Sequence, residues 1–171
     1  MAILALPTVA GKFGVRSGGY SMSNSAAWNI TRPWLGPEPT TRVVNMNKLG
    51  HALTDVNDPP IKLLFVYNCN PAATMPDQQR VIKGLEREDL FTVVFEQVMT
   101  DTAAYADVVL PNTTFLEAYD FARGYGPLSL QLVRPVIDAV GESRSNPDVF
   151  GELARRLDVL GADDPDNELD M

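Results

Sequence analysis

The sequence predicts an α/β protein whose doubly wound, mainly parallel sheet carries flanking helices. Three short apolar runs carry this prediction, at residues 61–67, 90–95 and 106–111. Each run is nearly unbroken and rich in Val, Phe or Leu, which is typical of strands buried on both faces. A helix-like segment separates the first two runs and a compact turn separates the last two, so the strands are expected to run parallel. This Rossmann-like pattern places strands near 61–67, 91–96 and 107–110.

Two helices are predicted from start signals that flank these runs. Thr74 is expected to cap a helix near 75–86, whose apolar residues recur on one face. Asn146 is expected to cap a helix near 147–158, with Pro147 at the first helical position. The two helices and three strands together make the α/β core of the prediction.

The chain divides by composition into three parts. Residues 1–60 form an irregular, glycine- and proline-rich segment expected to pack on the domain, and residues 61–160 form the α/β domain. Residues 161–171 form an acidic tail that is expected to be disordered.

Weaker patterns fill the remaining segments. Residues 2–10 read either as a strand or as a buried helix end, and the window is too short to decide. A short helix over 43–53 is expected to place Val43, Met46, Leu49 and Leu53 on one face, and a strand is expected over 129–133. The loop at 11–19 is rich in glycine, which suits either a surface loop or a backbone that closely approaches a ligand.

Composition excludes several functional classes. A net charge of −8 argues against nucleic acid as a partner. One cysteine and one histidine cannot build a zinc site, an iron–sulfur cluster or a disulfide framework. No stretch reaches the roughly 20 apolar residues of a membrane span, so the cytoplasm is the default expectation.

Three motifs lie at the carboxyl ends of the predicted strands or between them. Asn68-Cys69-Asn70-Pro71 follows the first run, Thr100-Asp101-Thr102-Ala103 follows the second, and Ala106–Pro111 precedes Phe115-Leu116-Glu117. At this spacing the motifs resemble those of the molybdopterin oxidoreductases of the dimethyl sulfoxide reductase and formate dehydrogenase type. The resemblance is densest over 61–120 and continues more loosely over most of the chain.

The resemblance implies a cofactor and partners. In these enzymes the corresponding domain holds the guanosine end of a molybdopterin guanine dinucleotide, and the molybdenum or tungsten ligand lies in another domain. An iron–sulfur cluster, where there is one, belongs to a preceding segment. The partners implied are the remaining domains of the parent catalytic subunit, which performs two-electron redox chemistry or oxygen-atom transfer. This chain by itself is expected to be inactive.

The candidate cofactor contacts lie mainly at the carboxyl edge of the sheet, where ligands of such folds bind. The turn at Asn70-Pro71 is expected to offer backbone N–H groups to a pyrophosphate, and Glu96 is expected to accept hydrogen bonds from ribose or guanine. The resemblance also implies that the turn at 100–102 and Asn146 contact the cofactor. The full candidate set is Asn68, Asn70, Pro71, Glu96, Gln97, Thr100, Thr102, Asp107 and Asn146.

Several residues carry a structural alternative. For Asp107, capping of the preceding turn and ligand contact are weighed equally. Cys69 is expected to be a small buried residue and not the metal ligand, because that ligand lies in an earlier domain of the family. His51 is expected to be structural, and Trp28 and Trp34 are expected to pack the irregular segment. The alternative function is a non-enzymatic nucleotide-binding or docking module with the same sheet.

Overall fold

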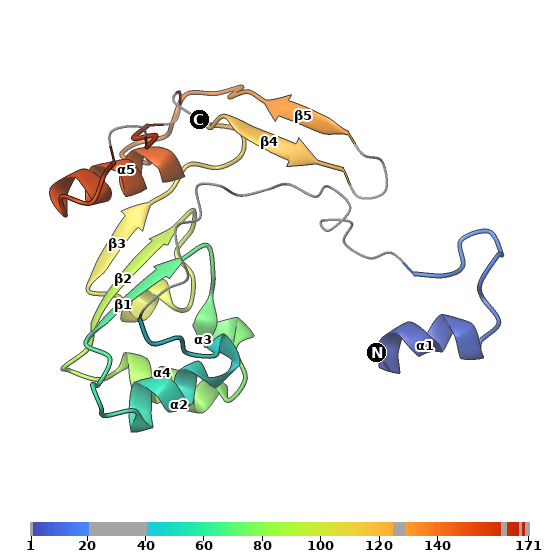
Figure 1. Ribbon diagram of the computed structural model, residues 1–171, viewed down its shortest axis with the longest axis horizontal. Coiled ribbons are helices and arrows are strands. Elements are labelled where there is room, and N and C mark those ends of the chain that lie inside the picture. The colour runs from blue at the N-terminus through green and yellow to red at the C-terminus, as the bar shows by residue number, and fades with distance from the viewer. Residues whose placement is uncertain (1, 21–40, 125–128, 162–163, 168, 170–171) are drawn as a thin grey trace. The chain divides into compact units, whose positions relative to one another are not determined.

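The computed structural model describes residues 2–20, 41–124, 129–161, 164–167 and 169 (Figure 1). The chain divides into two compact units, one of residues 1–37 with 121–131 and one of residues 38–120 with 132–171. The second unit contains the parallel sheet and both hydrophobic core clusters.

The sheet has three strands in the order β1-β2-β3, which are Leu63–Tyr67, Phe91–Glu96 and Val108–Pro111. Both pairings are parallel, with Phe65 beside Val93 in the first and Val94 beside Val109 in the second. The predicted α/β class and the parallel pairing are confirmed. Each predicted strand lies within two residues of the observed one.

One face of the sheet is covered by α2 (Leu49–Asp55), α3 (Pro71–Thr74) and α4 (Gln78–Leu85) (Figure 1). Gly84 lets α4 approach α2 closely, because a Cβ built there would lie 2.5 Å from Leu53 Cβ. The buried cluster under these helices consists of Leu53, Ala72, Val81, Leu85 and Leu90.

The other face is covered by α5 (Asn146–Arg156), which contributes Phe150. The Phe150 ring centroid lies 5.0 Å from that of Tyr67, 5.9 Å from that of Phe65 and 6.0 Å from that of Phe95. These three rings alternate along their strands with Leu64, Val66 and Val94, which pack in the two core clusters on the opposite face. Helices therefore cover both faces of the sheet, as a doubly wound fold requires.

Both predicted helix caps were wrong. Thr74 is the last residue of α3, and Met75 is extended, with φ −84° and ψ 146°. The physical reason is Pro76, since a proline disfavours helical backbone in the residue before it. The cap of α5 is Ser145, whose Oγ accepts from the backbone N–H of Asp148 at 3.4 Å.

The short helical segment before the sheet starts later than predicted. The 3₁₀ turn η2 (Met46–Lys48) leads into α2, and Leu49 and Leu53 pack in the core as expected. Val43 and Met46 are instead 80% and 61% exposed, so the predicted apolar face is only half correct.

Residues 2–10 contain a helix, α1 (Ala2–Val9), whose apolar side chains Ile3, Leu6 and Val9 are exposed. The helical alternative holds, but its expected burial does not. Trp28 and Trp34 lie outside the described residues, so their packing stays a prediction.

Towards the carboxyl terminus, β4 (Asp120–Arg123) and β5 (Leu130–Val133) form a two-stranded sheet. The strand predicted over 129–133 is confirmed, and β4 was not predicted. A second 3₁₀ turn, η3 (Ala103–Tyr105), links β2 to β3. The predicted tail at 161–171 falls partly outside the described residues. Among the described helices, none is long and apolar enough to span a membrane.

Candidate functional site

A hollow of about 320 Å³ lies where the strands of the sheet end. Asn68 follows β1, Gln97 follows β2, and the segment from Asn112 to Phe115 follows β3. The first turn of α5 closes the hollow with Asn146 and its neighbours. Segments distant in the sequence thus meet at the carboxyl edge, where the sequence predicts the ligand.

The lining of the hollow is polar but, apart from one carboxylate, uncharged. Its amides belong to Asn68, Gln97, Asn112 and Asn146, and its hydroxyls include that of Thr113. Phe115 and Tyr119 add aromatic rings, and Asp120 adds the carboxylate. Among the described residues, no lysine, arginine or histidine lines this hollow. Amides and rings can hydrogen-bond to and stack on a heterocyclic base, whereas a phosphate would favour cations.

Asn112 is the most constrained residue of the lining, and it is only 8% exposed. Its backbone N–H donates to the Glu96 carbonyl at 3.1 Å, and its Nδ2 donates to Asn146 Oδ1 at 2.8 Å. Its Oδ1 is buried and has no hydrogen-bond partner in the described part of the chain. Turning the amides of Asn112 and Asn146 round together would keep the bond between them and leave Asn112 Nδ2 unpartnered instead.

The start of α5 is held against β3 by a short parallel bridge. Thr113 N donates to the Arg144 carbonyl and Arg144 N donates to the Pro111 carbonyl, both at 3.2 Å. Ser145 then caps the helix, and this places Asn146 at the first helical position with its side chain against Asn112. The error of one residue in the predicted cap therefore matters, because the Asn146 side chain bonds across to the β3 loop.

Glu117 holds the loop that carries Phe115. One carboxylate oxygen accepts from the N–H and the hydroxyl of Thr114, both at 2.7 Å, and the other accepts from Val140 N at 2.7 Å. The Thr114 backbone N–H, followed by the Thr114 hydroxyl and the Val140 N–H, lowers the pKa of Glu117 below its ordinary value of 4.5.

Asn70 and Thr102 tie the loop after β1 to the loop after β2. Asn70 Oδ1 accepts from Thr102 Oγ1 at 2.7 Å and from Thr102 N at 3.2 Å, while its Nδ2 donates to Asp101 at 3.2 Å. The Thr102 hydroxyl also accepts from Ala72 N at 3.0 Å. The side-chain polar atoms of both residues are therefore used within the protein.

The remaining candidates lie in three places. Pro71 is buried at the start of α3, and Thr100 Oγ1 accepts from Ala103 N at 3.2 Å. Glu96 ends β2, and its Oε1 folds back to accept from Gln97 N at 2.8 Å. Asp107 lies at the opposite, amino edge, where it accepts from Thr92 N at 2.7 Å.

The structure thus gathers three of the nine candidates in the hollow: Asn68, Gln97 and Asn146. Sequence reasoning missed Asn112 and Ser145. Asn112 had a usable signal, since an asparagine directly after Pro111 stands at the carboxyl end of a predicted buried strand. Ser145 was missed because Asn146, beside it, is an equally good capping residue.

Cys69 and His51 have structural surroundings. Cys69 is half-buried beside the cluster of Val66, Val94 and Ala103. His51 Nδ1 lies 2.9 Å from Asp55 Oδ2, one turn along α2. In the described residues, no three His, Cys, Asp or Glu side chains are grouped so that they could hold a metal ion.

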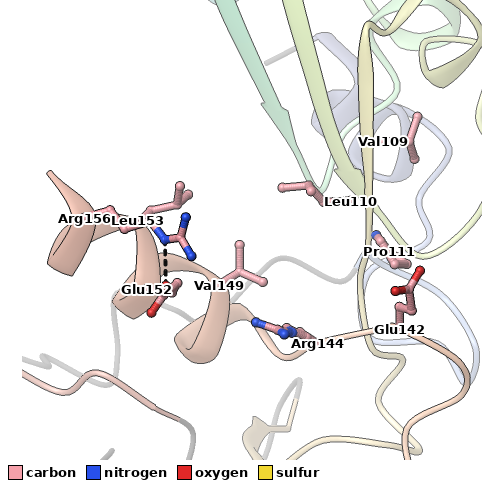
Figure 2. A pocket seen from close by; sticks show the side chains of 9 residues that line it. All are labelled: Val109, Leu110, Pro111, Glu142, Arg144, Val149, Glu152, Leu153 and Arg156. Atoms are coloured by element: carbon pink, nitrogen blue, oxygen red, sulfur yellow. Dashed lines mark hydrogen bonds and ion pairs between the residues drawn. The ribbon is translucent and has the colours of Figure 1, made fainter.

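A second hollow of about 410 Å³ lies between β3 and α5 (Figure 2). Its walls are mainly apolar and include Leu110, Val149 and Leu153, and the ion pair between Arg156 Nε and Glu152, 2.6 Å apart, lies at its edge (Figure 2). It lies beside β3, and its polar side chains are the charged groups of Glu142, Arg144, Glu152 and Arg156.

The glycine-rich loop forms a hollow of its own with α1, lined by Lys12, Arg16 and the residues after it. Gly11, Gly14 and Gly19 all have positive φ, so the loop depends on glycine. Contact between this loop and a ligand stays a prediction.

Comparison with known proteins gives the family. Residues 5–156 match the family model of the molybdopterin oxidoreductases. The chain belongs to the molybdopterin oxidoreductase family. Family membership implies a molybdopterin cofactor, and the residues of the hollow fit a part of it, because they supply uncharged hydrogen-bonding groups and rings at the carboxyl edge.

Individual relatives agree with this assignment. The chain is 44% identical over 160 residues to "Probable oxidoreductase YoaE" of Bacillus subtilis (strain 168), covering 91% of the chain and 23% of that protein. It is 32% identical over 151 residues to the dimethyl sulfoxide/trimethylamine N-oxide reductase of Cereibacter sphaeroides, covering 84% of the chain and 18% of that protein. The chain thus spans less than a quarter of the length of either relative.

A solved structure agrees as well. The acetylene hydratase from Pelobacter acetylenicus matches with a TM-score of 0.60 and 28% identity, over 68% of the chain and 16% of that protein. A molybdopterin oxidoreductase domain thus shares its fold with a protein named as a hydratase, so the fold of this domain does not fix the reaction.

Proposed function

We propose that this chain is the part of a molybdopterin-dependent oxidoreductase that binds the guanosine end of a molybdopterin guanine dinucleotide. The hollow at the carboxyl edge receives the base, with Asn68, Gln97, Asn112 and Asn146 as hydrogen-bonding partners. The parent protein carries out two-electron redox chemistry or oxygen-atom transfer at a metal held outside these residues, and an iron–sulfur cluster belongs to a further segment. This chain alone is inactive, and its partners are the remaining domains of the parent catalytic subunit.

The observation that carries the proposal is the lining of the hollow. Four amides from four separate segments converge on one cavity at the end of a parallel sheet. A purine presents both donors and acceptors on its edge. An Asn or Gln side chain can pair with either, because its amide has an acceptor oxygen and a donor NH2 group. The exposed ring of Phe115, at 72% exposure, is available to stack on a base.

The network of Asn70 and Thr102 has a supporting role in this proposal. It fixes the loops after β1 and β2 relative to each other, and so fixes the positions of Asn68 and Gln97. Glu96 lies next to Gln97 and keeps one carboxylate oxygen beyond its bond to the Gln97 amide. That oxygen is the proposed acceptor for a ribose hydroxyl. When bound, the metal-carrying pterin end of the cofactor supplies the redox chemistry.

The test is a titration of the 171-residue chain with GMP. Isothermal calorimetry measures the affinity, and the backbone amide signals in NMR spectra locate the binding site. Saturable binding with shifts at Asn68, Gln97 and Asn146 is the expected result. If GMP binds but shifts only the amide signals of the second hollow, between β3 and α5, the proposed location of the base is wrong. The absence of saturable binding at millimolar GMP would favour the docking-module alternative.

A further inference from the structure

We infer that Asn112 determines the preference of the hollow for guanine, by accepting a hydrogen bond from the N1–H and 2-amino edge of the base. This inference rests on the proposed function, since it names the residue that selects the base in the same hollow. Asn112 is not one of the motif residues that carry the family resemblance. It lies between the two parts of the third motif, directly after Pro111.

The first step is that the Asn112 amide is fixed before any ligand arrives. The backbone bond to Glu96 sets the position of Asn112 along β3, and the Nδ2 bond to Asn146 sets the direction of the amide. A fixed acceptor discriminates better than a mobile one, because less conformational freedom is lost when the ligand binds.

The second step is that the protein leaves the remaining atom unsatisfied. Buried side-chain oxygens nearly always have a partner, and in the described residues only Asn112 Oδ1 and Thr92 Oγ1 do not. Thr92 lies within β2 and does not line the hollow, whereas Asn112 does. The oxygen has almost no accessible surface of its own, so a ligand donor reaches it only when the side chains that cover it move, and the bond then satisfies an oxygen that folding leaves without a partner.

The third step concerns the chemistry of the ligand. Guanine carries adjacent N–H donors at N1 and at its 2-amino group, hypoxanthine lacks the amino group, and adenine has an acceptor at N1. The opposite orientation of the Asn112 amide would present a donor and prefer adenine. The pterin ring shares the donor edge of guanine, so both ends of the cofactor have the required chemistry. The hollow lies at the carboxyl edge of the sheet, where the proposed function places the nucleotide end of the cofactor, and we therefore assign guanine to it.

The experiment is calorimetric titration of the 171-residue chain with GMP, IMP, AMP and neopterin. For the wild type we expect GMP to bind about tenfold more tightly than IMP and AMP, which corresponds to one hydrogen bond to a buried group. Asn112→Leu, which has a similar shape but no polar atoms, should bring the ratio of GMP to IMP affinity close to one. Asn112→Asp keeps an acceptor and should restore the preference. Asn47→Leu, in η2, is the matched control and should leave the ratio unchanged.

A stability measurement accompanies the titration, because Asn112→Leu could fail through misfolding. We expect this variant to remain folded and to unfold cooperatively at a lower temperature than the wild type without ligand, since it removes an unpartnered oxygen but also loses the Nδ2 bond to Asn146. Added GMP should raise the unfolding temperature of the wild type more than that of the variant. If Asn112→Leu is unfolded, the ratio of GMP to IMP affinity of Asn112→Asp decides alone. Loss of the preference for GMP in that variant would overturn the inference.

The outcomes separate the inference from the proposed function. If the wild type binds GMP and Asn112→Leu retains the full preference over IMP, the inference falls and the proposed function stands. Tighter binding of AMP overturns the direction of the amide, and tighter binding of neopterin overturns the assignment to guanine. If the wild type binds none of the four compounds, the proposed function falls and the inference falls with it.

Discussion

At the scale of single residues, the side chains at the carboxyl edge of the sheet fall into two groups. Some hold the loops together by hydrogen bonds, and others line the hollow. The side chains of Asn70 and Thr102 form hydrogen bonds with each other and with neighbouring backbone, although the sequence predicted them to contact the cofactor. Asn68, Gln97 and Asn146 line the hollow. A sequence motif does not distinguish these two roles, because both are placed at the same strand ends.

Glu96 gives a prediction at this scale. Replacing Glu96 by Gln removes the charge while keeping the shape, and should weaken GMP binding by about tenfold, because a hydrogen bond to a charged acceptor contributes roughly 1.5–3 kcal/mol. The fold should be unchanged, since the remaining oxygen can still accept from the Gln97 amide. Calorimetry on both proteins measures the effect.

Glu88→Gln is the control for this change. Glu88 is exposed in the turn before β2, so its replacement should alter neither binding nor stability. Equal affinity of the wild type and Glu96→Gln for GMP would make Glu96 an ordinary glutamate at the end of a strand.

At the scale of elements, the loops are joined by side chains that reach across the sheet. The Thr102 hydroxyl bonds to the loop after β1 in two directions, and the residue is fully buried. Glu117 does the same for the loop after β3, joining Thr114 to Val140. The geometry of the hollow therefore depends on a few polar bridges between loops.

Thr102→Val tests the first bridge. Valine fills the same volume but leaves Asn70 Oδ1 and the Ala72 N–H with one bond fewer, which should cost about 1–3 kcal/mol of unfolding free energy. Urea denaturation followed by circular dichroism gives the value. In the double variant with Asn70→Ala the two losses should not add, since they remove the same interaction. Simple additivity would show that the bridge is not the source of the stability.

The carboxylate of Glu117 predicts a pH dependence. Its pKa is lower in the folded chain than its ordinary value of 4.5, because it accepts from Thr114 and Val140. Its contribution to stability is therefore complete above pH 4.5 and is lost as the pH falls through the lower folded value. Glu117→Gln should be less stable than the wild type near neutral pH, and the difference should vanish in acid. The exposed Glu142→Gln serves as control, and a difference that persists in acid would point to packing instead of charge.

How far the sequence predicted these elements depends on the signal that each one carries. The strands were predicted within two residues, because buried parallel strands read as continuous apolar runs. Both predicted caps were wrong. Pro76 keeps Met75 out of the helical conformation, so the helix predicted from residue 75 begins only at Gln78. The second helix is capped by Ser145 and not by Asn146. Asn112 could not be ranked above its neighbours, because an unpartnered amide depends on which side chains meet it in space.

At the scale of the whole molecule, the chain carries the hollow proposed to bind a nucleotide but spans less than a quarter of the length of the relatives named above. The sheet orders its loops around a hollow whose lining is polar and, apart from the Asp120 carboxylate, uncharged, and this suits recognition of a base. In the proposed function, the reaction takes place at groups outside these loops. The fold neighbour named as a hydratase shows that one domain architecture occurs in proteins of different named activity.

The last prediction follows from this division between recognition and chemistry. The purified 171-residue chain should contain no stoichiometric molybdenum or tungsten and should show no reductase activity toward dimethyl sulfoxide or nitrate. The physical reason is the donor set, since the one cysteine packs beside a core cluster and the one histidine is hydrogen-bonded to Asp55 in another part of the sheet unit. The same preparation should still bind GMP, which distinguishes an inactive but folded domain from a misfolded one. Elemental analysis after gel filtration measures the metal, and calorimetry measures the nucleotide. Molybdenum or tungsten that stays with the chain at one atom per molecule would show that a metal-holding group lies within these residues, and the recognition role proposed for them would then be too narrow.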